Sequence, residues 1–185
     1  EVEGKIHAGT SSEPFGPYSS YLKSKGLLET FRENFHGRGY FGADDSALET
    51  EDWHDVYIGR RAVQWLEERP KDYPYHMFVS FAGPHDPFDP PTEYADKYRN
   101  REMPPRVIDT GEGKPERVRK RMVRIDKRSE EELLHLRRQY CAAITAVDDM
   151  VGEILAAAEA RDDGRETYII FSADHGEMMC DHSLP

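Results

Sequence analysis

Two aspartate–histidine pairs lie close together near the end of the sequence, where an apolar run stops. The run YIIFSA leads directly into Asp174 and His175, and a second pair, Asp181 and His182, follows seven residues later. Charged and imidazole groups at the end of a buried strand are costly to desolvate unless something binds them. Carboxylate oxygen and imidazole nitrogen are both common metal ligands. Asp174 and His175 are therefore the candidate metal ligands.

Three further side chains are suited to binding or reacting with an oxyanion. In GKIHAG, Lys5 and His7 stand two residues apart, which puts both side chains on one side of an extended backbone. His85, in SFAGPHDP, could ligate a metal or transfer a proton. Each residue alone is a weak signal. A histidine before a proline-rich loop, such as His85, is more often structural. Together, the cation and the imidazoles describe a pocket for an oxyanion.

The second pair has two interpretations. Asp181 and His182 either lie in a loop that contacts substrate, or have a structural role or one that orients His175; the second interpretation is favoured. Cys180 is disfavoured as a ligand, since nothing adjacent completes a tetrahedral set. Cys180 and Cys141 are the two cysteines of the sequence and form no CxxC pair, which argues against a disulfide scaffold and leaves the compartment undetermined.

Two helices are expected to support these residues. Helically spaced apolar residues predict a helix over residues 53–69, with Asp52 as its cap and Pro70 as its stop. Ser129 and Glu132 form a capping box that opens a longer helix, ending at about residue 160. The expected buried stripe of this longer helix comprises Leu136, Tyr140, Ile144, Val147, Val151 and Ile154.

Two short, apolar runs rich in β-type residues, 75–83 and 167–172, predict strands, and the first suits a strand buried on both faces. The order strand, long helix, strand is typical of a right-handed parallel crossover. We therefore expect an α/β fold with a mainly parallel (mixed) sheet flanked by helices. Ligands gather at the carboxyl ends of such strands, so His85 and the pair Asp174–His175 should lie at one sheet edge. Residues 8–50 are expected to form mostly loops and short helices.

The composition limits the possible partners. The 185 residues carry a net charge of −11, which argues against nucleic acid as a general partner. The stretch 114–128 is the local exception because it is strongly basic. It is either a solvated loop or helix face, which is favoured, or a surface that attracts an anionic substrate or polymer. No apolar run approaches the roughly 18 residues of a membrane span. Any signal peptide is expected to lie outside these residues or not to exist, and the oligomeric state stays open.

Three motifs in order resemble those of the sulfatase family within the alkaline-phosphatase superfamily. GKIHAG, FVSFAGPHDPFDPPTEYADKY and YIIFSADHGEMMCDH are similar to that family's GKWHLG, SFxxPHxPxxxPxxY and SDHGExxGDH segments. The likeness spans nearly the whole chain and is least recognisable in residues 10–50. It implies an alkaline-phosphatase-like fold and the hydrolysis of sulfate esters, with a sulfated glycan as one substrate class.

The resemblance also implies roles for the motif residues. Asp174 and His175 match metal ligands, and Lys5 and His7 match the pair that contacts the sulfate group and the nucleophile. His85 matches the histidine near the leaving oxygen. The family's metal is usually calcium, although the imidazole of His175 would suit manganese or zinc at least as well.

The family's nucleophile, a formylglycine made from Cys or Ser before x-Pro-x-Arg, has no counterpart here. Cys141 precedes AAIT and Cys180 precedes DHSL. The two metal-binding aspartates expected before GKIHAG and a lysine expected beyond DHGExxGDH are also missing. We interpret residues 1–185 as a single internal segment of a sulfatase-like catalytic domain, which lacks the upstream nucleophile region and the C-terminal region. By itself this segment is expected to be inactive.

Two alternatives stay open beside a sulfatase. One is a phosphonate monoester or phosphodiester hydrolase of the same superfamily, against which the Lys5-x-His7 pair argues, because this pair is the sulfatase form. The other is a noncatalytic segment that binds metal or sulfate without turnover.

Overall fold

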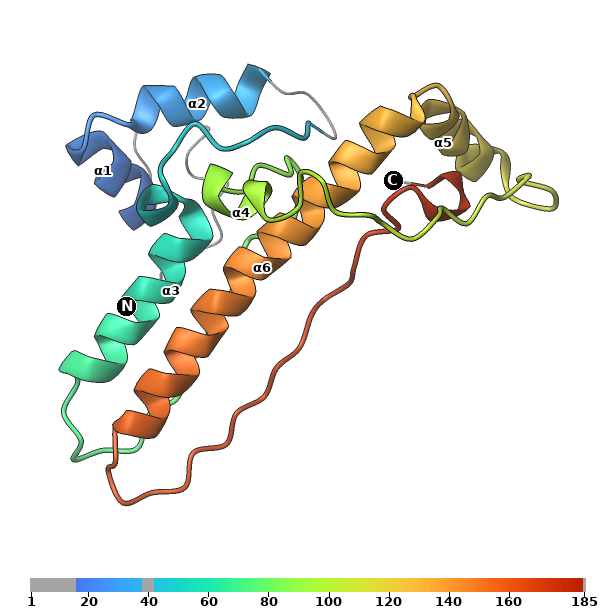
Figure 1. Ribbon diagram of the computed structural model, residues 1–185. Helices are drawn as coiled ribbons and strands as arrows, with labels where there is room; N and C mark the ends of the chain where they lie inside the picture. The colour runs from blue at the N-terminus through green and yellow to red at the C-terminus, as the bar shows by residue number, and fades with distance from the viewer. Residues whose placement is uncertain (1–15, 38–41, 185) are drawn as a thin grey trace.

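The computed structural model describes residues 16–37 and 42–184, so Lys5 and His7 lie outside the described part of the chain. Figure 1 shows two helices side by side, α3 (His54–Glu68) and the much longer α6 (Glu130–Ala160). The other described helices are α1 (Pro17–Ser24), α2 (Leu28–Gly37), η2 (Thr50–Asp52), α4 (Thr92–Asp96), α5 (Glu116–Asp126) and η3 (Asp181–Ser183). None of the described helices is both long and apolar enough to cross a membrane.

The start of α6 is confirmed as predicted. The Glu132 amide donates to Ser129 Oγ at 3.2 Å, and the Ser129 amide donates to Glu132 Oε2 at 2.7 Å. This capping box satisfies two amide groups that the first helical turn leaves without partners. The helix ends at Ala160, as the sequence predicted.

The buried face of α6 differs from the predicted stripe. It comprises Leu133, Leu136, Gln139, Ala142, Ala143, Ala146 and Met150. Leu136 is the one member of the predicted stripe in this set, and Ile144 is 42% exposed. Alanine occupies the contact because α3 approaches α6 closely: a Cβ atom on Gly59 of α3 would lie 2.7 Å from Met150 Cβ. Larger side chains at this contact would keep the two helices apart.

The predicted cap of α3 is wrong, because the N-cap residue is Trp53 and no side chain caps the helix. Asp52 belongs instead to η2, where its Oδ1 accepts hydrogen bonds from Tyr21 Oη at 2.5 Å and Lys25 Nζ at 2.6 Å. Its carboxylate therefore fastens α1 to the segment that enters α3.

The first turn of α3 binds the extended segment 75–83. Asp55 is fully buried, and its Oδ1 and Oδ2 accept hydrogen bonds from the amides of Ala82 and Gly83, both at 2.8 Å. His54 Nε2 lies 3.2 Å from Asp55 Oδ2. Burial lowers the pKa of His54, but the charge of Asp55, the hydrogen bond to it and the charge of Asp89 outweigh burial and raise it.

The predicted strands are not confirmed. Within residues 16–37 and 42–184 the sheet pairing consists of one isolated parallel bridge, between Ala43 and Phe88. Residues 75–83 are extended and half-buried on one side, but Phe78 on the other side is 83% exposed. Residues 167–172 lie at the surface, with Ile170 89% exposed, on a trace that runs alongside α6 (Figure 1). A strand needs an adjacent strand for its amide and carbonyl groups, and the described residues place none beside these segments.

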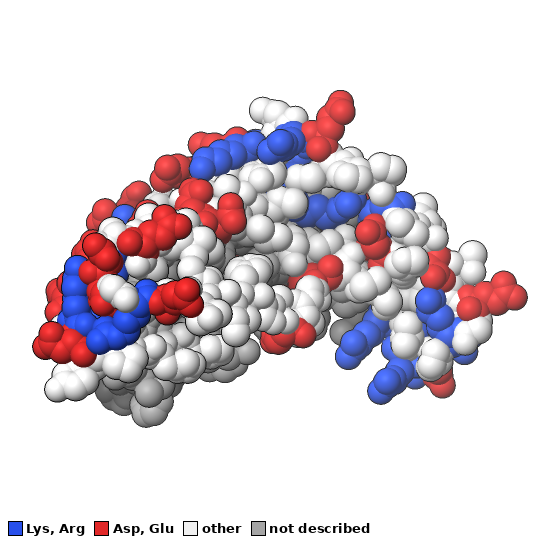
Figure 2. All heavy atoms as spheres, turned by 90° about the horizontal axis from the view of Figure 1, so that it is seen from below, with Lys and Arg blue, Asp and Glu red and all other residues white. Residues whose placement is uncertain are grey.

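Within the basic stretch 114–128, residues 116–126 form helix α5. Figure 2 shows Lys and Arg side chains gathered at the end of the molecule that carries this helix. Its Met122 and Ile125 are buried, and Ile125 packs with Leu133 and Leu136 of α6. One side of α5 is therefore part of the core, and the charged side is left to solvent.

We predict that Gly59→Ala destabilises the fold by about 1–3 kcal/mol, because the added methyl group overlaps the Met150 side chain. The matched control is Gly152→Ala, since nothing lies within 4 Å of a Cβ atom at this exposed position of α6. The control should stabilise the fold by about 0.5–1 kcal/mol through helix propensity. Urea denaturation of both variants measures the difference, and equal stabilisation would contradict the close α3–α6 contact.

We also predict that part of the stability falls as the pH rises. A raised pKa means that the folded protein binds the His54 proton more tightly than the unfolded chain, whose value is about 6.5. The stabilisation is therefore complete below pH 6.5 and is lost as the pH passes the higher folded pKa. Free energies of unfolding at pH 6 and pH 9 should decline more for the wild type than for His54→Gln. If the free energy of unfolding declines equally in both proteins, His54 does not cause the pH dependence of stability.

Candidate functional site

His85 is displayed at the surface with a defined ring orientation. Its Nδ1 lies 2.7 Å from the backbone carbonyl oxygen of Asp86. A carbonyl can only accept, so this hydrogen bond requires the proton on Nδ1 and makes Nε2 the atom available for chemistry. The side chain is 54% exposed, which keeps the ring within reach of a ligand. His85 can therefore act as a proton donor or acceptor through Nε2.

The proline-rich loop that carries His85 is anchored at both ends. Upstream, Asp55 holds the amides of Ala82 and Gly83. Downstream, Phe88 is buried, its ring meets Tyr140 edge-on at 5.5 Å, and its amide donates to the Gly42 carbonyl at 2.9 Å. These two anchors confine the short stretch in which His85 lies.

Asp174 and His175, the candidate metal ligands, lie on the exposed segment after residue 172, with side chains 84% and 63% exposed. The His175 amide donates to Asp174 Oδ1 at 3.0 Å, and His175 Nδ1 lies 3.0 Å from the carbonyl oxygen of Gly176. With the proton on Nδ1, the lone pair of the ring is on Nε2, which lies 3.9 Å from Asp174 Oδ2. One oxygen and one nitrogen donor thus stand on neighbouring residues.

These two donors do not make a metal site by themselves. Within the part of the chain that the structure describes, no three His, Cys, Asp or Glu side chains form a group that could hold an ion. One carboxylate and one imidazole also fit calcium, manganese and zinc without selecting among them. The sheet edge that was expected to bring His85 to Asp174 and His175 is not formed by the described residues.

The second aspartate–histidine pair fastens η3 to the segment before α5. The Val107 amide donates to Asp181 Oδ1 at 2.9 Å, and the His182 amide donates to the Val107 carbonyl at 2.6 Å. His182 Nδ1 also lies 3.3 Å from Asp109 Oδ2. Hydrogen bonds from the Gly111 amide and from the Lys114 ammonium lower the pKa of Asp109, so this carboxylate stays charged beside His182. These contacts favour the structural interpretation of Asp181 and His182.

Cys180 is buried, and burial raises the pKa of its thiol. Because a thiolate, not a thiol, is the metal ligand and the nucleophile, this environment argues against both roles for Cys180.

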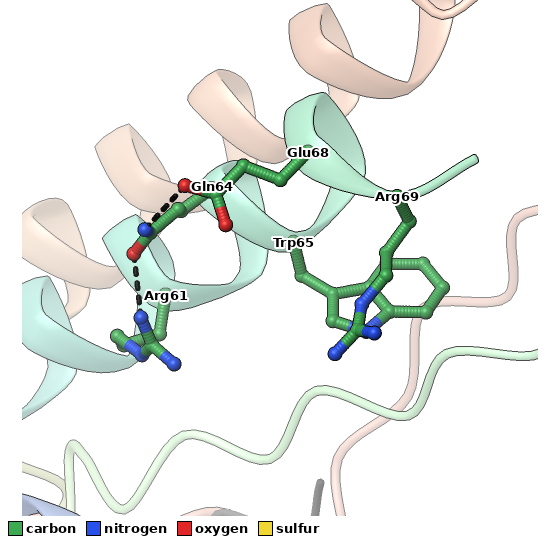
Figure 3. Close-up of a pocket in the computed structure, with 5 residues that line it drawn as sticks. All are labelled: Arg61, Gln64, Trp65, Glu68 and Arg69. Carbon is green, nitrogen blue, oxygen red and sulfur yellow. Dashed lines mark hydrogen bonds between the residues drawn. The ribbon is translucent and has the colours of Figure 1, made fainter.

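The hollow shown in Figure 3 lies elsewhere, on the outer side of α3. Its volume is about 70 Å³, and it is lined by Arg61, Gln64, Trp65, Glu68 and Arg69. All five residues come from one helix and its end, and binding sites for small molecules usually enclose several hundred Å³. The hollow is a gap between surface side chains and is not the site that the motifs predict.

Sequence reasoning did not single out Asp55, although its carboxylate accepts two hydrogen bonds from the amides just before His85. Asp55 opens the segment DVYIGRR, and its position in the first turn of a helix is common for an acidic residue. The available signal was the apolar surroundings, Trp53 and Val56, beside which a carboxylate needs specific partners.

Comparisons with known proteins agree with the motifs. A family model described as Sulfatase matches residues 11–185. An arylsulfatase of Clostridium perfringens is 28% identical over 130 residues, which are 69% of this chain and 27% of that protein. An uncharacterized sulfatase of Escherichia coli, YidJ, is 33% identical over 69% of this chain and 26% of its own length. A multifunctional alkaline phosphatase superfamily protein, PehA of Trinickia caryophylli, is 26% identical over 77% of this chain and 31% of its own length. The chain thus spans about a quarter to a third of these relatives, and over nearly all of its residues it belongs to the sulfatase family.

Proposed function

We propose that the protein containing this chain hydrolyses sulfate esters. The observation that carries the proposal is the sulfatase family match over residues 11–185, which includes the segments of His85, Asp174 and His175. Two of the relatives described above are themselves named as sulfatases. The surface display of His85 is compatible with this function, since its Nε2 can reach a ligand.

Residues 1–185 are, in this proposal, one segment of a larger catalytic domain. The chain spans 27% of the arylsulfatase and 26% of YidJ. Tyr168, Ile170 and Phe171 are large apolar side chains left at the surface of the described structure. Apolar patches of this kind usually mark an interface with further protein. The formylglycine, which supplies the nucleophile in this family, would then come from outside residues 1–185.

His85 is proposed to serve the leaving group. When the S–O bond of the ester breaks, the bond electrons stay on the leaving oxygen, which then needs a proton. In its imidazolium form, His85 delivers the Nε2 proton to that oxygen and becomes neutral, while the Nδ1 proton keeps the ring bonded to the Asp86 carbonyl. Lys5 and His7, outside the described residues, are proposed to bind the sulfate oxygens.

Asp174 and His175 are proposed as two of the ligands of a divalent cation, with calcium favoured. A bound cation would withdraw charge from the sulfate oxygens. Since no third His, Cys, Asp or Glu side chain of the described residues groups with these two, the remaining ligands are assigned to other parts of the protein. A sulfated glycan is the substrate class to test first beside aryl sulfates, because the basic helix α5 would attract a polyanion.

The alternative is a phosphonate monoester or phosphodiester hydrolase. The similarity to PehA, named as a multifunctional member of the superfamily, favours testing it. The same substrate panel tests the third candidate, a segment that binds metal or sulfate without turnover.

We expect the full-length protein to release sulfate from aryl sulfates faster than it hydrolyses matching phosphate, phosphonate or phosphodiester substrates. His85→Ala should lower kcat/KM for sulfate esters by about 10²–10⁴-fold, because the leaving oxygen loses its proton donor. The loss should be larger for leaving groups of higher pKa. His76→Ala is the control, since His76 is an exposed histidine on the same extended segment. Turnover of phosphorus esters alone would move the protein to the alternative branch, and no turnover would favour the binding segment.

We expect EDTA to abolish sulfate release and an added divalent cation, calcium first, to restore it. Asp174→Asn should lower the bound metal per protein, as measured by elemental analysis after dialysis, because the carboxylate ligand is lost. Asp148→Asn is the control, because Asp148 is an exposed carboxylate on the surface of α6. Full metal content and activity in Asp174→Asn would remove Asp174 from the ligand set.

A further inference from the structure

We propose that Asp55 is the positioning residue of His85: its carboxylate fixes the backbone of Ala82 and Gly83 and so determines where His85 presents its ring. The inference rests on the proposed function, in which His85 acts on the leaving group. Asp55 belongs to none of the three motifs and lies 30 positions before His85 in the sequence. Its role follows from its contacts in the folded chain.

The carboxylate binds two consecutive amides with one oxygen each. Oδ1 accepts from the Ala82 amide and Oδ2 from the Gly83 amide, and both bonds measure 2.8 Å. Hydrogen bonds to an ionised acceptor are about twice as strong as neutral ones. Two parallel bonds to adjacent amides also fix the direction of the peptide plane between them, which a single bond would not.

The connection continues to His85 through one more hydrogen bond. The His85 amide donates to the Ala82 carbonyl at 3.3 Å, which closes the turn over Gly83 and Pro84. Ala82 therefore donates to Asp55 and accepts from His85. The path from the α3 carboxylate to the backbone of His85 consists of two hydrogen bonds.

Gly83 is fitted to this carboxylate. A Cβ atom on Gly83 would lie 2.3 Å from Asp55 Oδ2 and 3.7 Å from Trp53 Cη2. In folded proteins, a Cβ atom essentially never lies within 3 Å of a non-bonded heavy atom. The carboxylate thus occupies the space of a side chain at position 83, and only glycine lets the backbone approach it so closely.

The energetics explain why a carboxylate at this position indicates a specific role. Asp55 is fully buried beside a core cluster that contains Trp53 and Val56. Burying a charge costs several kcal/mol unless it is paired, and well-packed apolar residues often replace buried ion pairs without loss. The other end of the loop has an anchor that requires no buried charge, the apolar side chain of Phe88. The carboxylate supplies what an apolar anchor cannot, two directed hydrogen bonds to the backbone next to His85.

The variant Asp55→Asn keeps the volume but turns one acceptor toward the amides into a donor. The bond to Ala82 or to Gly83 is then lost, and the turn before His85 can shift. A displacement of about 1 Å at a reacting group lowers the rate by about 10²-fold. In the full-length protein we expect kcat for aryl sulfates to fall by about 10- to 100-fold, with KM changed far less.

Asp52→Asn is the matched control. Asp52 is another buried carboxylate, three positions earlier, but its carboxylate accepts hydrogen bonds from Tyr21 and Lys25 instead of from the His85 loop. It should lower the unfolding temperature as Asp55→Asn does while leaving kcat near the wild-type value. Equal losses of kcat in the two variants would reduce Asp55 to a general stabilising residue and overturn the inference.

A double-mutant cycle with His85→Ala separates positioning from stability. If Asp55 acts through His85, Asp55→Asn should cost no further activity once His85 is alanine. Additive losses would overturn the inference. If His85→Ala is inactive but Asp55→Asn is as active as the wild type, the inference fails and the proposed function stands. If His85→Ala is fully active, the proposed role of His85 fails, and the inference fails with it.

Amide hydrogen exchange gives a readout that does not depend on activity. The amides of Ala82 and Gly83 should exchange at least tenfold faster in Asp55→Asn than in Asp52→Asn, because their acceptors are disturbed. Gly83→Ala should give the same faster exchange around residue 83 with Asp55 still present, which covers the case that Asp55→Asn does not fold. Unchanged exchange in both variants would show that the carboxylate does not order this turn.

Discussion

The close contact between α3 and α6 is the constraint on which the described structure depends. It exists because Gly59 and a face of alanines let the two backbones approach, with the Met150 side chain lying where a Cβ atom on Gly59 would be. Tight helix packing fixes both the separation and the rotation of α3, since a packed interior tolerates little change in volume. The packing therefore fixes the position of the first turn of α3. The segments that this turn binds by hydrogen bonds are fixed relative to α6 as well.

Three nearby residues at that turn make different contacts. Asp52 faces α1 and accepts hydrogen bonds from Tyr21 and Lys25. Asp55 faces the extended segment 75–83 and accepts hydrogen bonds from two of its amides. Trp53 lies between them in the core. Two buried carboxylates so near to each other would repel if they shared one environment, but each has its own partner, the Lys25 ammonium for Asp52 and the His54 ring for Asp55. The charges therefore connect separate parts of the chain to one rigid helix.

The sequence predicted what depends on neighbours along the chain and missed what depends on distant contacts. The capping box of Ser129 and Glu132 is local chemistry, and it was confirmed to the residue. The strands 75–83 and 167–172 were predicted from apolar character, but a strand also needs an adjacent strand, which no local pattern supplies. The α6 stripe failed for a related reason: hydrophobicity favours Ile144, whereas the tight contact with α3 selects alanine. Asp55 escaped notice because its partners lie 27 and 28 positions away.

The two halves of the candidate site differ in how far the described residues organise them. His85 lies between a buried carboxylate and a buried phenylalanine, so its place is set before any ligand arrives. Asp174 and His175 are largely exposed, and their donors are neither buried nor completed by a third ligand among the described residues. Two adjacent carboxylate and imidazole groups in water are well solvated and need no ion for stability. Binding an ion there would require further ligands from outside the described residues. The described residues therefore set the position of His85 from the α3 side, whereas they supply Asp174 and His175 with no third metal-binding side chain.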